Sequence, residues 1–352
     1  MKTSKTLYLD ITGIVLAALI ALVCGFAVIL VTSSDPLAAI KSLLVDPLSN
    51  WFNVGTILNK AVPLIFTGLA LSVAFQSGVF SMGAEGQLYV GGFLGSLIAI
   101  SLPGLSPWIH LPLIFVCAMI GGALFGAIPG YLKAYLNANE IVTTLMLNFV
   151  ATLGTSYFVN NVFKDPSSGG YARMEFFEKD LLLGKIIPGF SAHAGILIAI
   201  LAVVVVHLLM YKTKLGYELR LVGKNSQFAA YGGIKTKRVI IYSIMIGGAL
   251  AGLAGIVEIL GVHGTYKDNF SNGLGFDGII IALLARNNPI GVLVAALFYA
   301  YIQVGAQTMQ MGSDMPRELA VIIQVMLVLL VSAQAIFTYL KQRYAKDQKA
   351  VK

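Results

Sequence analysis

Long uncharged apolar segments recur along the whole sequence and restrict the fold to a membrane protein. The first of them, residues 11–32, contains no charged residue. A helix needs about 20 apolar residues to cross the hydrocarbon core of a bilayer. Only 11% of the 352 residues are charged and 57% are hydrophobic, whereas soluble domains carry roughly 25% charged residues. The sequence therefore predicts an all-α, polytopic membrane helix bundle, embedded over about residues 11–340.

About ten segments are predicted to cross the membrane. Nine have a suitable length, and a tenth, residues 277–285, is apolar but short for a full crossing. We count the tenth because the amino terminus, residues 212–238 and residues 341–352 are basic and are expected on the same side of the membrane. That arrangement requires an even number of crossings. The nine longer segments are residues 11–32, 54–75, 83–102, 110–132, 141–163, 194–211, 239–262, 289–311 and 318–340.

The positions of the basic residues predict the orientation, since cytoplasmic loops are enriched in lysine and arginine. Residues 212–238 hold seven basic residues against Glu218, and residues 341–352 hold five against Asp347. We expect both segments and the amino terminus to be cytoplasmic. Residues 164–193 balance four basic against four acidic residues and are expected to form an external loop. The net charge of +8 then reflects orientation, and no nucleic acid partner is expected.

Pairs of glycines four residues apart predict close helix packing. Such spacing lets helix backbones approach one another in lipid. The pairs are Gly91/Gly95, Gly122/Gly126, Gly126/Gly130 and Gly248/Gly252. They indicate a tightly packed bundle in which residues 1–352 form a single transmembrane domain.

The sequence gives no sign of enzyme chemistry, a metal site or a cofactor. The four histidines have no metal-ligand spacing, and the two cysteines form no CxxC pair. Residues 223–238, "GKNSQFAAYGGIKTKR", look at first like a phosphate-binding loop. A P-loop reads GxxxxGK[ST], but Lys224 is followed by Asn225, and Glu218 stands where the first glycine belongs. Nucleotide hydrolysis by this chain is excluded.

The same segment is better explained as a short cytoplasmic helix. Asn225 or Ser226 can cap its start, because either side chain accepts an orphan backbone N–H. Gly232 and Gly233 can end it through a left-handed residue. So short a helix is unstable alone, and we expect it to need a partner surface.

A few polar residues lie in or between the predicted spans and are candidates for a solute pathway. Intramembrane polar groups are costly and commonly functional, although each can also be a structural hydrogen-bond partner. Two of the passages are alike: "FSMGAEGQL" (residues 80–88) and "FSNGLGFDGI" (residues 270–279) both lead to an acidic residue followed by glycine. Five predicted crossings separate them, which suggests an inverted repeat. The candidates are Glu85, Gln87, Asn148 and Asp277.

Three stretches carry a resemblance to a known family. Residues 216–255 resemble the coupling region of permease subunits of ATP-binding cassette importers for ribose, nucleosides and branched-chain amino acids. Residues 83–87 ("GAEGQ") and 273–291 ("GLGFDGIIIALLARNNPIG") resemble the nucleoside-type permeases, which work with basic-membrane-protein-like lipoproteins. The resemblance covers about residues 54–340. It departs at Ser81 and Met82, where Asn-Ile is usual, and at Ala285, where glycine is usual.

The resemblance implies a multi-pass permease of a bacterial plasma membrane that translocates nucleosides with ATP hydrolysed elsewhere. The implied partners are a second homologous permease, a cytoplasmic ATP-binding cassette ATPase, an extracellular substrate-binding lipoprotein, the nucleoside and membrane lipid. Simple sugars or another small polar solute stay open as cargo, and an ion-coupled secondary transporter or a membrane-embedded enzyme are the rival classes. The residues implied in ATPase coupling are Gly223, Asn225, Ala229, Ala230, Gly233 and Ile234.

Overall fold

The computed structural model describes residues 35–186 and 191–313, with the single positions Leu30, Ser33, Val321, Ile322 and Val325. These residues are helical apart from connecting loops, and β-pairing among them is limited to isolated bridges between Arg173 and Lys267 and between Lys185 and His193. The chain divides into a compact unit of residues Leu58–Ala300 and a second unit that holds the residues up to Ile57 and from Tyr301.

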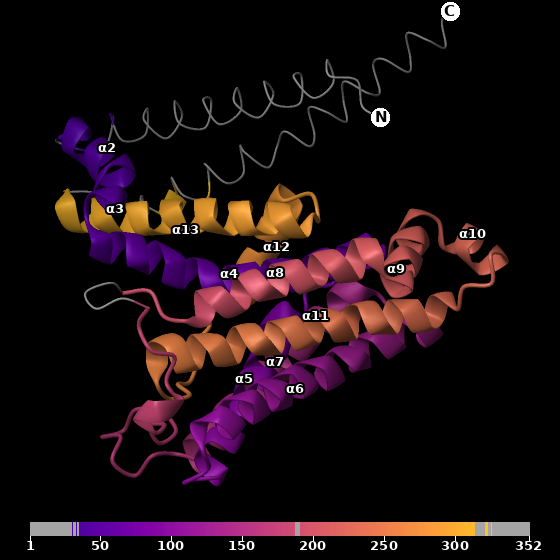
Figure 1. Cartoon of the computed structure of the whole chain (residues 1–352), viewed down its shortest axis with the longest axis horizontal. Helices are drawn as coiled ribbons and strands as arrows, with labels where there is room; N and C mark the ends of the chain where they lie inside the picture. Colours follow the sequence, from indigo (N-terminus) through magenta and orange to yellow (C-terminus); the bar gives the residue numbers. More distant parts are fainter. Residues whose placement is uncertain are drawn as a thin grey trace, which may run out of the picture. The chain divides into compact units, whose positions relative to one another are not determined.

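Twelve α-helices, a 3₁₀ turn and a π-helical turn make up the described residues (Figure 1). In chain order they are α2 (Pro36–Leu44), α3 (Asp46–Ser49), α4 (Trp51–Gln76), α5 (Ala84–Ser101), α6 (Pro107–Leu136), α7 (Glu140–Asn161), η1 (Lys179–Leu181), α8 (Gly195–Lys212), α9 (Lys214–Lys224), α10 (Ser226–Tyr231), α11 (Thr236–Glu258), η2 (Ile259–His263), α12 (Leu274–Leu284) and α13 (Pro289–Gly312).

The long helices coincide with predicted spans to within a few residues. Six described helices are long and apolar enough to cross a membrane: α4, α6, α7, α8, α11 with η2, and α13. Helix α5 occupies the span predicted at residues 83–102 but is not among the six, because Glu85 and Gln87 lie in its first turn. The predicted spans 11–32 and 318–340 and the tail 341–352 lie outside the described residues or touch them only at single positions.

The short tenth segment is a genuine but incomplete helix. Helix α12 has 11 residues, which at 1.5 Å per residue gives about 16 Å, whereas the hydrocarbon core is about 30 Å thick. The helix alone therefore cannot cross. Its start is fixed by Gly273 in a left-handed conformation, and the turn after it contains Arg286 and Asn287 with positive φ. The total of ten crossings stays a prediction.

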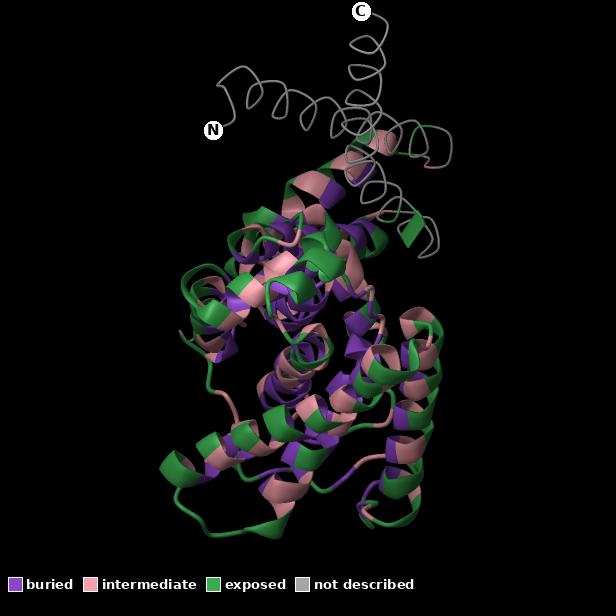
Figure 2. Ribbon diagram, turned by 90° about the vertical axis from the view of Figure 1, so that its right-hand side faces the viewer, coloured by how far each residue is buried: buried purple, intermediate pink, exposed green. Residues whose placement is uncertain are grey.

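Glycines let α5, α6 and α11 pack closely within the 58–300 unit, as their spacing predicted. A side chain on Gly122 of α6 would overlap the carbonyl oxygen of Gly248 on α11, and a Cβ on Gly126 would lie 2.8 Å from the Ile244 oxygen. These contacts make α6 and α11 antiparallel. Gly91 of α5 packs in the same way on Gly252. Helix α6 buries one side, whereas the second half of α11 is buried on all sides; buried residues are purple and exposed residues green in Figure 2.

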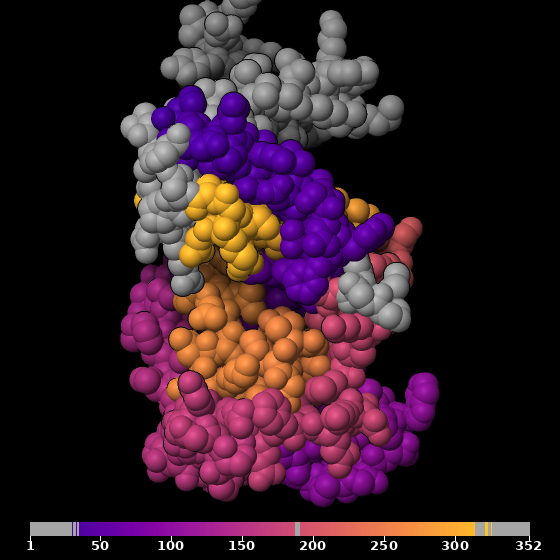
Figure 3. Space-filling view, turned by 90° about the vertical axis from the view of Figure 1, so that its left-hand side faces the viewer, coloured from indigo at the N-terminus to yellow at the C-terminus, as the bar shows by residue number. Residues whose placement is uncertain are grey.

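The two ends of this unit differ in character. One end, here the loop end, carries the segment between α7 and α8, in which Met174 N–H donates to the Tyr266 oxygen at 3.0 Å and Asp268 N–H to the Ala172 oxygen at 2.9 Å. Figure 3 faces this end, where the rose and orange segments lie side by side. The opposite end carries α9 and α10 (Figure 1) and is called the α10 end.

Near the loop end His193 is buried just before α8. Its Nδ1 accepts the Gly195 N–H at 3.1 Å, and its exposed fraction is 1%. Burial lowers the pKa of His193 to about 4, because the charged imidazolium cannot be hydrated there. The ring is therefore neutral at physiological pH and acts as a structural acceptor.

In the second unit the end of α13 packs on α2. The Thr308 hydroxyl donates to the Ser42 oxygen at 2.6 Å, and the Tyr301 hydroxyl donates to the Leu44 oxygen at 2.5 Å. The Asp35 carboxylate caps α2 by accepting the Ala38 N–H at 3.1 Å.

The predicted orientation can be tested with one cysteine at each end of the 58–300 unit, in a background lacking Cys24 and Cys117. Tyr171 at the loop end is 79% exposed, so Tyr171→Cys should react with a membrane-impermeant maleimide added to intact cells. Ser226→Cys at the α10 end should react only after the cells are opened. Labelling of Ser226→Cys alone in intact cells would invert the orientation. Ser168 is unsuitable as the external probe, because only 6% of it is exposed.

Candidate functional site

The segment 223–238 forms the short helix that the sequence predicted. Asn225 is the N-cap of α10, and its Oδ1 accepts the Phe228 N–H at 3.0 Å. The helix ends after one and a half turns, where Gly233 adopts a φ of 82° that only glycine adopts without strain. The preceding helix α9 was not predicted. Its N-cap is Thr213, whose hydroxyl accepts the Gly216 N–H at 3.1 Å.

Of the two alanines implied in ATPase coupling, only one lies on the exposed face of α10. Ala229 is fully buried against its own chain, whereas Ala230 is exposed. Ala229 is therefore part of the core beneath α10, and Ala230 is the alanine that a partner can reach. Phe228 and Tyr231 are 63% and 92% exposed. Two exposed aromatic side chains on a six-residue helix are the apolar contacts that a partner surface can bury.

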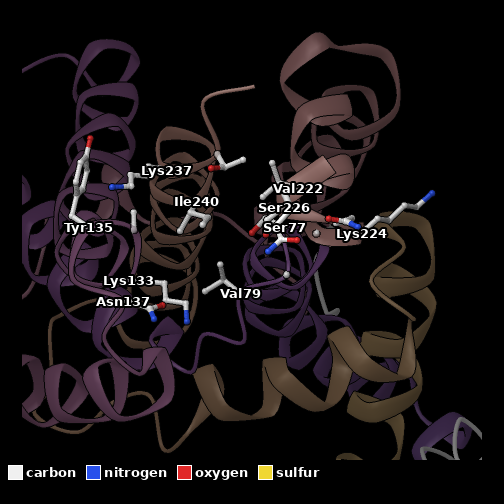
Figure 4. Close-up of a pocket in the computed structure, with 16 residues that line it drawn as sticks. Ser77, Val79, Lys133, Tyr135, Asn137, Val222, Lys224, Ser226, Lys237 and Ile240 are labelled. Atoms are coloured by element: carbon white, nitrogen blue, oxygen red, sulfur yellow. The ribbon is translucent and has the colours of Figure 1, made fainter. Parts of the chain in front are cut away.

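An open pocket of about 820 Å³ lies beside α10 (Figure 4). Three lysines line it, but two are already engaged: Lys133 Nζ lies 2.7 Å from Glu140 Oε2, and Lys237 Nζ lies 4.8 Å from the centre of the Tyr135 ring. The third, Lys224, extends away from the other labelled side chains in Figure 4. The lysines therefore do not converge as in a phosphate site.

The end of α4 contacts α9, the turn after α12 and helix α11. A side chain on Gly223 of α9 would overlap the Gln76 carbonyl oxygen. A Cβ added at Gly78 would lie 3.1 Å from the Gly223 Cα. The Gln76 side-chain amide donates to the Asn287 oxygen after α12. The hydroxyls of Ser77 and Ser243 lie 2.8 Å apart. A movement of α9 must therefore displace the segment that precedes α5.

Replacing Gly223 by valine tests this contact. The new side chain meets backbone atoms that cannot rotate away, so the end of α9 must shift from α4, and we expect solute uptake to fall several-fold with the protein still in the membrane. Gly154→Val is the matched control, because nothing lies within 4 Å of a Cβ at Gly154. Equal uptake by the two variants would show that the close approach of α9 to α4 is dispensable.

The break between α4 and α5 is held by α7. Asn148 Oδ1 accepts the Gly86 N–H, and its Nδ2 donates to the Met82 oxygen, both at 2.9 Å. Thr144 Oγ1 accepts the Met82 N–H at 3.1 Å. Asn148, only 5% exposed, thus satisfies backbone groups that have no helical partner, as broken backbone at membrane depth requires.

The two similar glycine-containing passages meet in space. Glu85, 6% exposed, accepts the N–H of Gly275 with Oε2 at 2.7 Å. The carboxylate therefore sits at the start of α12, where unpaired N–H groups and the helix dipole favour a negative charge. We call this contact the Glu85 clasp. Gln87 is 3% exposed, and its amide packs beneath Gly126.

Asp277 lies two residues further along α12. Its Oδ1 accepts the Tyr299 hydroxyl at 2.7 Å. Three of the four predicted pathway residues thus hold neighbouring elements through hydrogen bonds, and the fourth, Gln87, packs against α6. Contact of these residues with the solute stays a prediction.

The exposed aromatic residues of α10 were not predicted from the sequence. Phe228 and Tyr231 could have been found as aromatic residues three apart in a basic loop. No group of three or more potential metal ligands occurs among the residues that the structure describes.

The comparisons with known proteins agree on one family. Residues 53–332 match the family model described as branched-chain amino acid transport system / permease component. The chain is 35% identical, over 95% of its length and 90% of the relative's, to the glucose ABC transporter permease protein TsgB13 of Haloferax volcanii. It is 34% identical, over 90% of its length and 92% of the relative's, to the guanosine ABC transporter permease protein NupP of Bacillus subtilis.

A third relative is the nucleoside ABC transporter permease protein NupB of Lactococcus lactis subsp. cremoris, which is 31% identical over 96% of each chain. Family model and relatives both extend over most of the chain. Together with the six membrane-length helices, they identify a multi-pass membrane protein that is a transport component rather than an enzyme. The chain belongs to the branched-chain amino acid transport system permease family, a family of ABC transporter permeases.

Proposed function

We propose that this permease carries nucleosides into a bacterial cell across the plasma membrane, driven by ATP that a separate subunit hydrolyses. Two relatives named for guanosine and nucleoside transport match at least 90% of the chain. The motifs at residues 83–87 and 273–291 point to the same branch. The permease breaks no covalent bond in this role. It changes its population of access states because its partners bind those states with different affinity.

The observation that carries the coupling to an ATPase is the exposed face of α10. A helix this short has little stability of its own, yet it presents Phe228, Ala230 and Tyr231 to the outside. Buried aromatic side chains supply much of the energy of protein interfaces. We infer that α10 docks in a groove of a cytoplasmic ATP-binding cassette ATPase, with Asn225, Gly233 and Ile234 shaping its ends.

The remaining partners follow from the proposed import. A substrate-binding lipoprotein would deliver the nucleoside at the loop end, and a second homologous permease would complete the pathway. Helix α7 offers a surface for that permease or for lipid, since Met146, Phe149 and Leu153 are 56%, 63% and 69% exposed along one face.

Simple sugars are the second candidate cargo. The favouring observation is the 35% identity to a permease named for glucose. Nucleosides and sugars share a polyhydroxylated ring, so one pathway chemistry can serve either.

Competition of uptake separates the two cargoes. Cells or proteoliposomes that hold the complete transporter are given radiolabelled uridine, with an excess of guanosine, cytidine, ribose or glucose. We expect ATP-dependent uridine uptake that the other nucleosides inhibit and the sugars do not. Uptake of labelled glucose without any uptake of uridine would transfer the assignment to simple sugars.

A further inference from the structure

An open apolar groove lies where α6, α9 and α11 meet in the 58–300 unit. Its volume is about 380 Å³. The residues that line it are Ala123 of α6, Leu215 of α9, and Tyr242, Met245, Ile246 and Ala249 of α11. Apart from the Tyr242 hydroxyl, these side chains offer no group that forms a strong hydrogen bond. Whatever occupies the groove is therefore held there mainly by apolar contact.

The groove continues into the exposed apolar surface of membrane-length helices. Helices α6 and α11 are both long and apolar enough to cross a membrane. On α6, Ile120 and Leu124 stand on either side of Ala123 in the sequence and are 51% and 60% exposed. The Tyr242 side chain of α11 is 45% exposed. In a bilayer such surface is covered by lipid tails, which are as apolar as leucine.

Backbone contacts fix the walls of the groove. Helices α6 and α11 touch through Gly122 and Gly248, where an added Cβ would overlap a carbonyl oxygen of the other helix. Helix α9 turns back sharply on the end of α8, because Gly216 packs against the Leu209 carbonyl oxygen. Leu215, the residue before Gly216, is thereby held in the wall that α9 contributes. The groove is therefore formed before any ligand arrives.

Basic residues adjoin the groove on two of its helices. Residues four apart share one face of a helix, so Arg238 lies one turn before Tyr242 on the same face of α11. Arg238 is exposed, and the ion pairs recorded among the described residues do not include it. On α9, Lys214 directly precedes Leu215. Its side chain is 90% exposed, and its Nζ lies 3.9 Å from Glu218, a weak ion pair in water.

An apolar groove with basic residues beside it fits an anionic phospholipid. An acyl chain matches the apolar lining, and an acidic headgroup matches the basic residues, as in other basic pockets between membrane helices. Tyr242 stands between the two regions, and tyrosine is enriched at this level of a bilayer because its ring is apolar and its hydroxyl polar. Free phosphate would make no use of the apolar groove, and an apolar helix of a partner would make no use of the charges.

We propose that the groove between α6, α9 and α11 is a binding site for an anionic phospholipid such as phosphatidylglycerol. One acyl chain packs between Leu215 and the exposed face of α11, and the headgroup pairs with Arg238 and Lys214. The lipid then joins α9 to α11. Because α9 leads directly into α10, a bound lipid also limits how far α10 can move from the bundle. This site does not depend on which solute the permease carries.

A tryptophan placed in the groove reports the bound lipid directly. Trp51 and Trp108, the two tryptophans of the chain, are replaced by phenylalanine, and Tyr242→Trp supplies the reporter. The full chain is reconstituted in phosphatidylcholine bilayers with a small fraction of brominated phosphatidylglycerol or brominated phosphatidylcholine, whose bromine atoms quench a nearby tryptophan. We expect phosphatidylglycerol to be preferred by about fivefold or more, the factor that one basic residue contributes near an acidic lipid.

Further variants separate the headgroup from the acyl chain. Arg238→Gln and Lys214→Gln should each lower the preference for phosphatidylglycerol, and together they should abolish it. Ala249→Phe fills the groove and should lower quenching by both lipids. Lys224→Gln is the matched control, because it removes an exposed lysine that lines a different pocket, and the preference should not change. A reporter at Leu201→Trp, on an exposed position of α8, should show no preference.

Three outcomes would overturn the lipid site. Equal quenching of Tyr242→Trp by the two lipids refutes the selection of an acidic headgroup, and so does a preference that survives the loss of both Arg238 and Lys214. Absence of quenching by either lipid shows that protein covers the groove, as a second copy or a partner helix would. Should Tyr242→Trp not accumulate in the membrane, Met245→Trp, which lines the same groove, gives the same comparison. No solute uptake is measured, so failure of this site leaves the proposed import untouched.

Discussion

Uptake is expected to fall to background when Ala230 is replaced by arginine. Ala230 lies on the exposed face of α10 beside Phe228 and Tyr231. A guanidinium forced into a packed groove remains desolvated and unpaired, a penalty of about 3–5 kcal/mol in a tight interface. The free permease should tolerate the change, since arginine is a good helix former. ATP-driven uptake and co-purification of the ATPase with the permease are the two measurements.

The neighbouring residues supply the controls. Lys224→Ala should keep most of the uptake, because this exposed side chain extends away from the other labelled side chains in Figure 4. Ala229→Arg should instead damage the permease itself, since Ala229 is buried, and should lower its abundance in the membrane. If Lys224→Ala abolished uptake while Ala230→Arg did not, the docking of α10 would be refuted and a phosphate site would have to be reconsidered.

Local features of the sequence predicted α10 well. The Asn225 cap and the left-handed Gly233 are effects of single residues on adjacent backbone, and both are found in the structure. The burial of Ala229 could not be predicted in this way. It depends on which side of a one-turn helix faces the bundle, and that is decided by residues far away in the sequence. The glycine contacts of α6 and α11 were predictable because their spacing repeats over several turns.

For the predicted pathway residues, too, local features could be predicted from the sequence and distant contacts could not. Their polarity within apolar segments marked Glu85, Asn148 and Asp277 as unusual. Their partners are a different matter: Glu85 and Gly275 are 190 positions apart, and only the likeness of residues 80–88 and 270–279 hinted at a relation.

The Glu85 clasp and α10 are linked through a short series of contacts. Helix α9 directly precedes α10 in the chain, and its Gly223 packs against Gly78. The segment after Gly78 leads directly into α5, whose first turn contains Glu85. Helix α12 is held from its other end as well, because Gln76 binds Asn287. A displacement of α10 by an ATPase can therefore reach both ends of α12. The clasp therefore lies where such a displacement would be transmitted, and its part in transport is a prediction.

Replacing Glu85 by alanine is expected to reduce uptake at least tenfold while the transporter still assembles. The change leaves the Gly275 N–H without its acceptor, and an unsatisfied buried donor costs about 1–3 kcal/mol. If the clasp forms in only one access state, the whole cost falls on that state, and each 1.4 kcal/mol changes its population about tenfold. Initial rates of uptake and the amount of assembled complex are measured on the same membranes.

Glu85→Gln separates the hydrogen bond from the charge. Glutamine can still accept the Gly275 N–H, but it loses the attraction between a carboxylate and the positive end of α12, so an intermediate rate is expected. Glu178→Ala removes an exposed carboxylate from the loop between α7 and α8 and should leave the rate unchanged. Wild-type uptake in Glu85→Ala would show that α12 keeps its position without the carboxylate, and the clasp would then be a structural contact with no part in transport.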